Sequence, residues 1–304
     1  MPVLLHIGLP KAASTFLQQA VSQRDEVQLV SYGAFGIEQR ALATVNGLEL
    51  PVSPEPPALT DKVVVSSEEL IGYGPDVPRY QRLCAEALAA TFPGSKVLVM
   101  TRAPLSFADS FYNQLVKEGT SDNPDVFARR WGEFLVEVQY YPRLLRLYEG
   151  LFGPGSVLCL PMEQLRSSPE SAFDAIRRHS GLDLTPSRPE IIRGNRSLAP
   201  KELHAMRVLN KIVSIMARGP APTEMQREAL DRLKRNFISY YMADGDAERR
   251  FERAIRPLHV GPKRPSILAR LTSRQRARIG EGQSPLWKLP QYASQSTLYS
   301  AGLA

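Results

Sequence analysis

The sequence has few of the residues that hold small secreted domains together or that form metal clusters. Only two cysteines occur, Cys84 and Cys159, and both lie in apolar segments. We therefore expect no disulfide framework and instead two buried, inert thiols in a reducing, cytoplasmic setting. The four histidines are scattered, and none stands with cysteines at the spacing of a metal site.

Long apolar runs are also missing. No stretch approaches about 18 consecutive apolar residues, the length that indicates a membrane-spanning helix. Residues 1–10 have no basic segment ahead of their short apolar run, which is not the pattern of a signal peptide. We therefore expect a chain without transmembrane segments.

Positive charge, by contrast, is plentiful. Lysine and arginine together number 38 against 31 acidic residues, which gives a net charge of +7. This surplus favours anionic partners such as nucleotides, acidic glycans or nucleic acid, and it does not choose among them. With 43% hydrophobic residues, the chain also has enough apolar mass for a large core.

Short apolar segments alternate with segments of helical periodicity in the first half of the chain. The predicted strands are residues 3–7, 63–65, 96–100 and 156–160. This alternation predicts an α/β fold in which helices cover both faces of a central parallel sheet. Ligands of such sheets bind beyond the carboxyl ends of the strands, where Gly8, Glu68 and Arg102 fall.

Other segments carry weaker signals. Residues 41–60 are proline-rich and aperiodic and predict a loop. The expected organisation is one domain over 1–262, with motifs in 3–165 and a helical region in 166–262, and then a basic tail over 263–304. The end of that tail is either disordered or docked on the core by Trp287 and Tyr292.

The turn after the first strand is typical of phosphate binding. It reads Gly8-Leu9-Pro10-Lys11-Ala12-Ala13-Ser14-Thr15 and leads into a helix, whose first N–H groups and dipole attract anions. The loop of nucleoside triphosphatases has a Gly-Lys pair near its end, whereas this turn has Ala13-Ser14 there and carries its lysine earlier, at position 11.

This turn resembles the 5′-phosphosulfate-binding loop of the sulfotransferase family, which has Pro-Lys, small residues, Ser/Thr-Thr and a large apolar residue after a strand. The matching residues here are Pro10, Lys11, Ala12, Ala13, Ser14, Thr15 and Phe16. A glycine common in that loop is replaced by Ala13. The resemblance implies a three-layer, P-loop-like fold with a helical C-terminal region, and 3′-phosphoadenosine-5′-phosphosulfate as cofactor without a metal.

A second motif follows the strand at 96–100. Arg102 comes after it, and Ser110 lies eight positions later in the next helix. In sulfotransferases residues at this spacing bind the 3′-phosphate of the cofactor, and a guanidinium is suited to a bidentate grip on phosphate oxygens. Arg193 and Asn195 lie in a basic loop where the family folds a further segment over the nucleotide.

Transfer of a sulfuryl group needs a base, because the acceptor loses its proton as the new S–O bond forms. In the family this base is a His or Glu that follows a strand, and here the segment 63–69 ends in Glu68 and Glu69. The family pattern hydrophobic-Ser-x-Glu favours Glu68, although both glutamates can instead cap the following helix. Lys11 would stabilise charge on the bridging oxygen. His6 is expected to be a core histidine.

Two alternatives remain open on sequence alone. The segment 63–69 can also be a strand whose acids hold Mg²⁺ in an ATP-dependent kinase, although the missing Gly-Lys pair and Arg102 argue against this. The basic run from Lys263 to Arg278 can belong to a nucleic-acid or glycan-binding protein, or to a solvated face. For a sulfotransferase, we expect a carbohydrate or small metabolite as acceptor and no specific nucleic acid.

Overall fold

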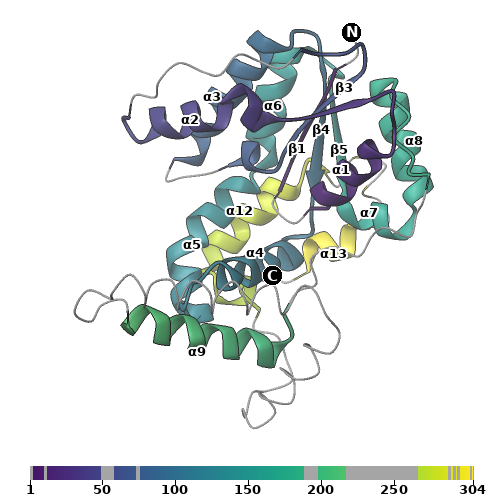
Figure 1. Cartoon of the computed structure of the whole chain (residues 1–304). Coiled ribbons are helices and arrows are strands. Elements are labelled where there is room, and N and C mark those ends of the chain that lie inside the picture. Colours follow the sequence, from purple (N-terminus) through teal and green to yellow (C-terminus); the bar gives the residue numbers. More distant parts are fainter. Residues whose placement is uncertain are drawn as a thin grey trace. The chain divides into compact units, whose positions relative to one another are not determined.

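Five parallel strands form the sheet of this chain in a computed structural model (Figure 1). They are β1 (Val3–Gly8), β2 (Gln28–Ser31), β3 (Val63–Ser67), β4 (Lys96–Thr101) and β5 (Val157–Pro161). Their order across the sheet is β2-β3-β1-β4-β5, and every neighbouring pair is parallel. The predicted α/β fold with a central parallel sheet is confirmed.

The structure describes residues 3–9, 12–48, 58–72, 76–187, 198–216, 266–286, 289, 292, 295–301 and 303. The chain forms two units. The larger unit consists of Met1–Phe107, Trp131–Gly194 and Leu271–Ala304, and the smaller one of Ala108–Arg130 and Asn195–Arg270. Within the described ranges, no helix has the length and apolar character needed to cross a bilayer.

Helices cover both faces of the sheet. The helices that lie wholly or partly in the larger unit are, in order, α1 (Ser14–Ser22), η1 (Tyr32–Phe35), α2 (Ile37–Val45), η2 (Glu69–Ile71), α3 (Val77–Thr91), α4 (Pro104–Lys117), α5 (Pro124–Val138), α6 (Tyr141–Phe152), α7 (Met162–Ser167), α8 (Pro169–Ser180), α12 (Ser273–Gln283) and α13 (Ser296–Ser300). Helices α1 and α8 lie over one face and α3 and α6 over the other (Figure 1). Phe16 of α1 packs edge-to-face on Phe173 of α8, with ring centroids 5.7 Å apart.

The core of the larger unit forms because its central strands are apolar on both faces. Val63, Val64 and Val65 of β3 are fully buried, as is every residue of β1 from Leu4 to Ile7. Such continuous apolar strands suit a sheet that helices cover on both sides. The two cysteines are free and buried, as predicted, and burial raises the pKa of the Cys84 thiol to about 12.

Three elements differ from the sequence prediction. Strand β2 was not predicted, because it has only four residues at the edge of the sheet and two of its side chains are exposed. Helix α2 continues to Val45, inside the segment 41–60 that predicted a loop. Helix α12 begins with a Thr272/Gln275 capping box, a signal that is legible in the sequence as Thr-x-x-Gln.

The smaller unit contains the later part of α4, the earlier part of α5, α9 (Pro200–Met216) and η4 (Leu268–Arg270). Asn210 of α9 donates through its amide to the carbonyls of Val116 and Thr120, at 2.7 and 2.9 Å. The Tyr112 ring packs on Phe127, with centroids 4.7 Å apart. These contacts join its helices around a small aromatic core.

Candidate functional site

The central three strands of the sheet end side by side at one edge. Strand β1 pairs with β3 on one side and with β4 on the other. Neighbouring strands lie about 4.8 Å apart, so the residues that follow them are close together. Glu68 follows β3, the turn to α1 follows β1, and Arg102 follows β4. The sequence prediction that these residues share one edge is therefore confirmed.

The order of the strands also gives that edge a switch point, where open parallel sheets are expected to have a crevice. The chain leaves β1 toward β2 on one side and leaves β4 toward β5 on the other, so the connections diverge between β1 and β4. Open parallel sheets bind ligands at such a switch point. The two strands approach closely there, because a Cβ on Gly8 would lie 2.9 Å from the Cβ of Met100.

The turn between β1 and α1 has a strained backbone. Ala13 has φ of 69°, in the left-handed region that favours glycine, and it precedes the first residue of α1. The carbonyl of Leu9 accepts from Ala12 N at 3.0 Å, which closes the turn. Pro10 and Lys11 lie outside the described residues.

The first residues of α1 provide donors at the positive end of the helix. Ser14 is buried, and its hydroxyl has no hydrogen-bond partner within the described part of the chain. Thr15 is exposed, Phe16 is partly buried, and no acidic residue lies in this first turn. A buried hydroxyl without a partner is costly, and an anion at the helix N-terminus would satisfy it.

A histidine lies in the core behind the turn. His6 of β1 is fully buried, and its Nδ1 is 2.8 Å from the hydroxyl of Ser66, its partner in β3. That hydroxyl also accepts from the amide of Gln18 in α1 at 3.0 Å. Burial lowers the pKa of His6 to about 3, so the ring is neutral. The expected role of His6 as a core histidine stays the simplest interpretation, although its Nε2 has no partner among the described residues.

The end of β3 separates the two candidate bases. Glu68 is partly buried and its side chain makes no capping bond to η2, whereas Glu69 is exposed. The N–H of Glu69 is instead capped by the Ser67 hydroxyl at 3.0 Å. Glu68 thus occupies the N-cap position of η2 without a side-chain capping bond, and Glu69 lies in the first turn.

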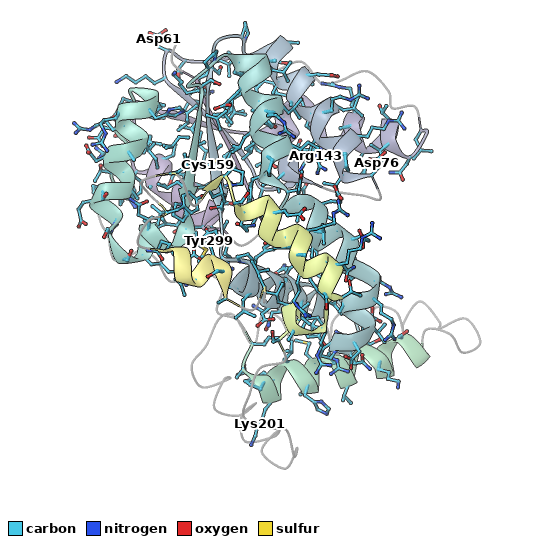
Figure 2. All side chains as sticks on the ribbon, turned by 180° about the vertical axis from the view of Figure 1, so that it is seen from behind. Asp61, Asp76, Arg143, Cys159, Lys201 and Tyr299 are labelled. Atoms are coloured by element: carbon cyan, nitrogen blue, oxygen red, sulfur yellow. The ribbon has the colours of Figure 1, made fainter. Side chains whose placement is uncertain are left out.

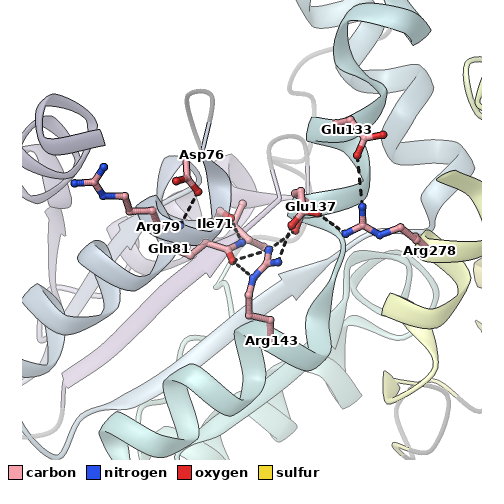
Figure 3. A network of polar contacts seen from close by, with 8 residues as sticks. All are labelled: Ile71, Asp76, Arg79, Gln81, Glu133, Glu137, Arg143 and Arg278. Atoms are coloured by element: carbon pink, nitrogen blue, oxygen red, sulfur yellow. Dashed lines mark hydrogen bonds and ion pairs between the residues drawn. The ribbon is translucent and has the colours of Figure 1, made fainter. Parts of the chain in front are cut away.

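A polar network that the sequence did not reveal holds the segment after these glutamates (Figure 3). Gln81 of α3 donates to the carbonyl of Ile71 and accepts from Arg143 at 3.2 Å. Arg143 pairs with Glu137 at 2.6 Å, and Glu137 also binds Arg278 of α12 at 2.5 Å. The network thus connects the 3-10 helix beside Glu68 to the C-terminal region.

The end of β4 is held at both its backbone and its side chains. Arg102 is partly buried, and its Nε donates to the Ser106 hydroxyl at 2.7 Å. The N–H of Ala103 donates to Glu163 Oε1 at 3.0 Å. Arg102 therefore follows a strand end that is held in place, and its own side chain is bonded to Ser106.

Other predicted residues fall elsewhere. Ser110 is buried and belongs to the smaller unit. Arg193 and Asn195 lie outside the described residues. Their predicted contacts with the cofactor stay predictions.

Three arginines of the basic run near the C-terminus contact the protein itself, whereas Lys263 and Arg264 lie outside the described residues. Arg278 pairs with Glu133 and Glu137 in the larger unit, where Arg276 donates to the carbonyl of Leu271. Arg270 pairs with Asp125 in the smaller unit. These contacts weaken the interpretation of the run as a surface for nucleic acid.

Comparison with known proteins gives likenesses in structure only. No family model matches the chain, and no curated protein matches it. A crystal structure of a sulfotransferase from Alicyclobacillus acidocaldarius matches with a TM-score of 0.45 and 16% identity, over 71% of this chain and 92% of that one.

A second solved structure is the sulfotransferase domain from the curacin biosynthetic pathway. It matches with a TM-score of 0.40 and 14% identity, over 67% of this chain and 83% of that one. Both identities are low, so these matches do not assign an activity to this chain.

Proposed function

We propose that the chain is a sulfotransferase, which moves a sulfuryl group from 3′-phosphoadenosine-5′-phosphosulfate to a hydroxyl or amine of an acceptor. The supporting observation is the junction of β3, β1 and β4, where Glu68, the turn into α1 and Arg102 end at one edge. An anion-binding helix terminus, a guanidinium and a carboxylate are the groups that this reaction requires.

The residues of the turn fit a phosphate group. The Ser14 hydroxyl, which has no partner in the described ranges, and the first N–H groups of α1 provide donors, and Arg102 follows the neighbouring strand β4. In this proposal the turn holds the 5′ side of the nucleotide and Arg102 holds its 3′-phosphate. The bound phosphosulfate supplies an activated sulfuryl group.

Glu68 is proposed to act as the base. It accepts the proton of the acceptor while the acceptor oxygen or nitrogen forms a bond to sulfur and the bond from sulfur to the phosphate oxygen breaks. Lys11 provides positive charge where negative charge develops on that leaving oxygen, which stays with adenosine 3′,5′-bisphosphate. Sulfur keeps its oxidation state in this transfer, so no oxidant or reductant is needed.

Thermal unfolding with nucleotides tests the proposal against the kinase alternative. We expect adenosine 3′,5′-bisphosphate with EDTA to raise the melting temperature, since a ligand that binds only the folded state stabilises it. ATP with Mg²⁺ is expected to have a much smaller effect. A larger shift with ATP and Mg²⁺ would favour phosphoryl transfer and contradict the proposal.

Substitution of the two glutamates tests the base. In a sulfuryl-transfer screen over hydroxylated and amino acceptors, we expect Glu68→Gln to lower kcat by about 10²- to 10⁴-fold, because general base catalysis is lost. Glu69→Gln is the matched control and should retain turnover. Affinity for adenosine 3′,5′-bisphosphate should be unchanged in both variants. Full turnover in Glu68→Gln with loss in Glu69→Gln would assign the base to Glu69 instead.

A further inference from the structure

Two tyrosines from the C-terminal segment reach the end of β4. Tyr292 and Tyr299 are both fully buried, and their rings meet edge-to-face with centroids 5.2 Å apart. Tyr299 belongs to α13, which lies beside α7 in the larger unit (Figures 1 and 2). Of the two residues expected to dock the chain after 280 on the core, Tyr292 is buried and Trp287 lies outside the described residues.

Both hydroxyl groups meet at one side chain. Thr101, the last residue of β4, is fully buried, and its Oγ1 bonds to the hydroxyl of Tyr292 and, at 2.9 Å, to that of Tyr299. Tyr299 donates to Glu163 Oε2 at 3.2 Å, and Glu163 Oε1 accepts from the N–H of Ala103 at 3.0 Å. The contacts run from Thr101 through Tyr299 and Glu163 to Ala103, and the backbone between Thr101 and Ala103 closes them into a ring.

Each hydroxyl has one proton to donate, and this fixes which group is the donor in each hydrogen bond of the ring. A carboxylate only accepts, so the Tyr299 hydroxyl uses its proton on Glu163 and must accept from Thr101. Thr101 has then used its own proton, so Tyr292 donates to it. Burial raises the pKa of both tyrosines well above the ordinary value, so they keep these protons at working pH. Every hydroxyl in the ring is thus used once as a donor.

Arg102 is the residue between the two anchored neighbours. The ring holds the side chain of Thr101 on one side and the backbone of Ala103 on the other. The bond from Arg102 Nε to Ser106 then orients the guanidinium. A bidentate contact with phosphate needs a guanidinium whose plane is fixed, because a misplaced guanidinium loses one of its two hydrogen bonds.

We propose that Tyr299, with Tyr292 and Glu163, is a positioning residue that presents Arg102 to the 3′-phosphate of the nucleotide. This inference rests on the proposed function and extends it, because it assigns a part of the nucleotide site to the C-terminal segment. The tyrosines act through Arg102 and do not touch the ligand.

The test compares two nucleotides that differ only at the 3′ position. Calorimetry on the full chain measures the affinity for adenosine 3′,5′-bisphosphate and for adenosine 5′-monophosphate. We expect Tyr299→Phe to weaken binding of the bisphosphate by roughly tenfold, about the effect of one hydrogen bond, and to leave the monophosphate unchanged. Tyr148→Phe is the matched control, since Tyr148 is equally buried and its hydroxyl has no partner among the described residues.

Further variants separate this inference from the proposed function. Arg102→Ala should abolish the preference for the bisphosphate; if it does not, the role of Arg102 fails and the inference fails with it. If Arg102→Ala does so while Tyr299→Phe keeps the preference, the inference alone is wrong. Equal weakening of both nucleotides by Tyr299→Phe would indicate a merely structural role and also contradict it.

A pair of substitutions at Thr101 covers the case in which Tyr299→Phe does not fold. Thr101→Ser keeps the hydroxyl and should keep the preference for the bisphosphate, whereas Thr101→Val removes the hydroxyl and should lose it. Retention of the preference in Thr101→Val would overturn the inference.

Discussion

The two turns that flank the switch point are built in opposite ways. On either side of the turn from β1 to α1, polar atoms of His6 in β1 and of Ser14 in α1 are buried without partners among the described residues, and Ala13 in the turn has a strained backbone. In the turn from β4 to α4, the hydroxyl of Thr101 and the N–H of Ala103 are both bonded. The region around the β1 turn thus has buried polar atoms without partners among the described residues, whereas the polar groups at the β4 turn are bonded within the protein.

This difference indicates two ways to build a binding edge. Unused buried donors cost stability in the unbound chain, and a ligand that satisfies them recovers that energy on binding. A bonded turn costs nothing of this kind and instead keeps one side chain in place. We infer that the first turn contacts the ligand through its own atoms, whereas the second presents Arg102 on a rigid support.

The largest expected effect concerns His6 and the pH. Burial lowers its pKa from 6.5 to about 3. In the unfolded chain the imidazole of His6 therefore binds a proton below pH 6.5, whereas in the folded chain it binds that proton only near pH 3. The stability from this residue is complete above pH 6.5 and is lost as the pH falls toward 3.

Urea unfolding from pH 7 to pH 4 checks this. In wild type, His6 should contribute a loss of about 1.4 kcal/mol per pH unit below its ordinary pKa, the limit for one proton. His6→Asn keeps a donor near Ser66 but does not titrate, so its profile should be flatter by that amount. Parallel profiles for the two proteins would show that His6 is not strained by burial, and the contrast between the turns would weaken.

A smaller effect on the free energy of unfolding is expected when the buried hydroxyl of Thr101 or that of Ser14 is removed. Thr101→Val removes the partner of the Tyr292 hydroxyl and leaves the Tyr299 hydroxyl bonded to Glu163 alone, so we expect the free energy of unfolding to fall by about 1–3 kcal/mol. Ser14→Ala removes a hydroxyl that has no partner within the described ranges, so stability should stay equal or rise by up to about 1 kcal/mol.

The same pair should respond differently to the nucleotide. Ser14→Ala is expected to weaken binding of adenosine 3′,5′-bisphosphate by roughly fivefold to tenfold, because one donor is lost. Chemical denaturation and calorimetry on both variants measure the two quantities. A stability loss in Ser14→Ala as large as that in Thr101→Val would mean that the Ser14 hydroxyl is already satisfied.

Sequence reasoning predicted the fold because the central strands are unusually uniform. The run Val63–Val65 has no polar interruption, and a fully buried parallel strand is what such a run describes. Strand β2 has no such run, since its alternating burial and its place at the edge allow polar residues. The position of Glu68 and Arg102 followed from the strand ends, because all parallel strands end at the same edge.

The support around the site was not predictable from the sequence. Thr101 meets Tyr292 and Tyr299 across 191 and 198 positions of the chain, and no local pattern announces such a contact. Gln81 and Arg143 are likewise ordinary helix residues until tertiary packing brings them together. The sequence motif predicts which residue types meet the ligand, whereas the residues that hold them depend on the packing of distant elements.

The smallest expected effect returns to Ala13, where the family loop commonly has glycine. An alanine in the left-handed region is strained by about 1–2 kcal/mol, while a glycine there costs about 0.5–1 kcal/mol more entropy on folding. We therefore expect Ala13→Gly to raise the free energy of unfolding by about 0.5–1 kcal/mol, as measured by urea unfolding.

Gly94 provides the reverse control, because its φ of 72° places it in the same region and nothing lies within 4 Å of an added Cβ. Gly94→Ala should lower stability by a similar amount, since it introduces the strain that Ala13→Gly removes. A loss of stability in Ala13→Gly would show that the first turn is held by contacts that outweigh its backbone strain, and the distinction between a strained turn at β1 and a bonded turn at β4 would then be wrong.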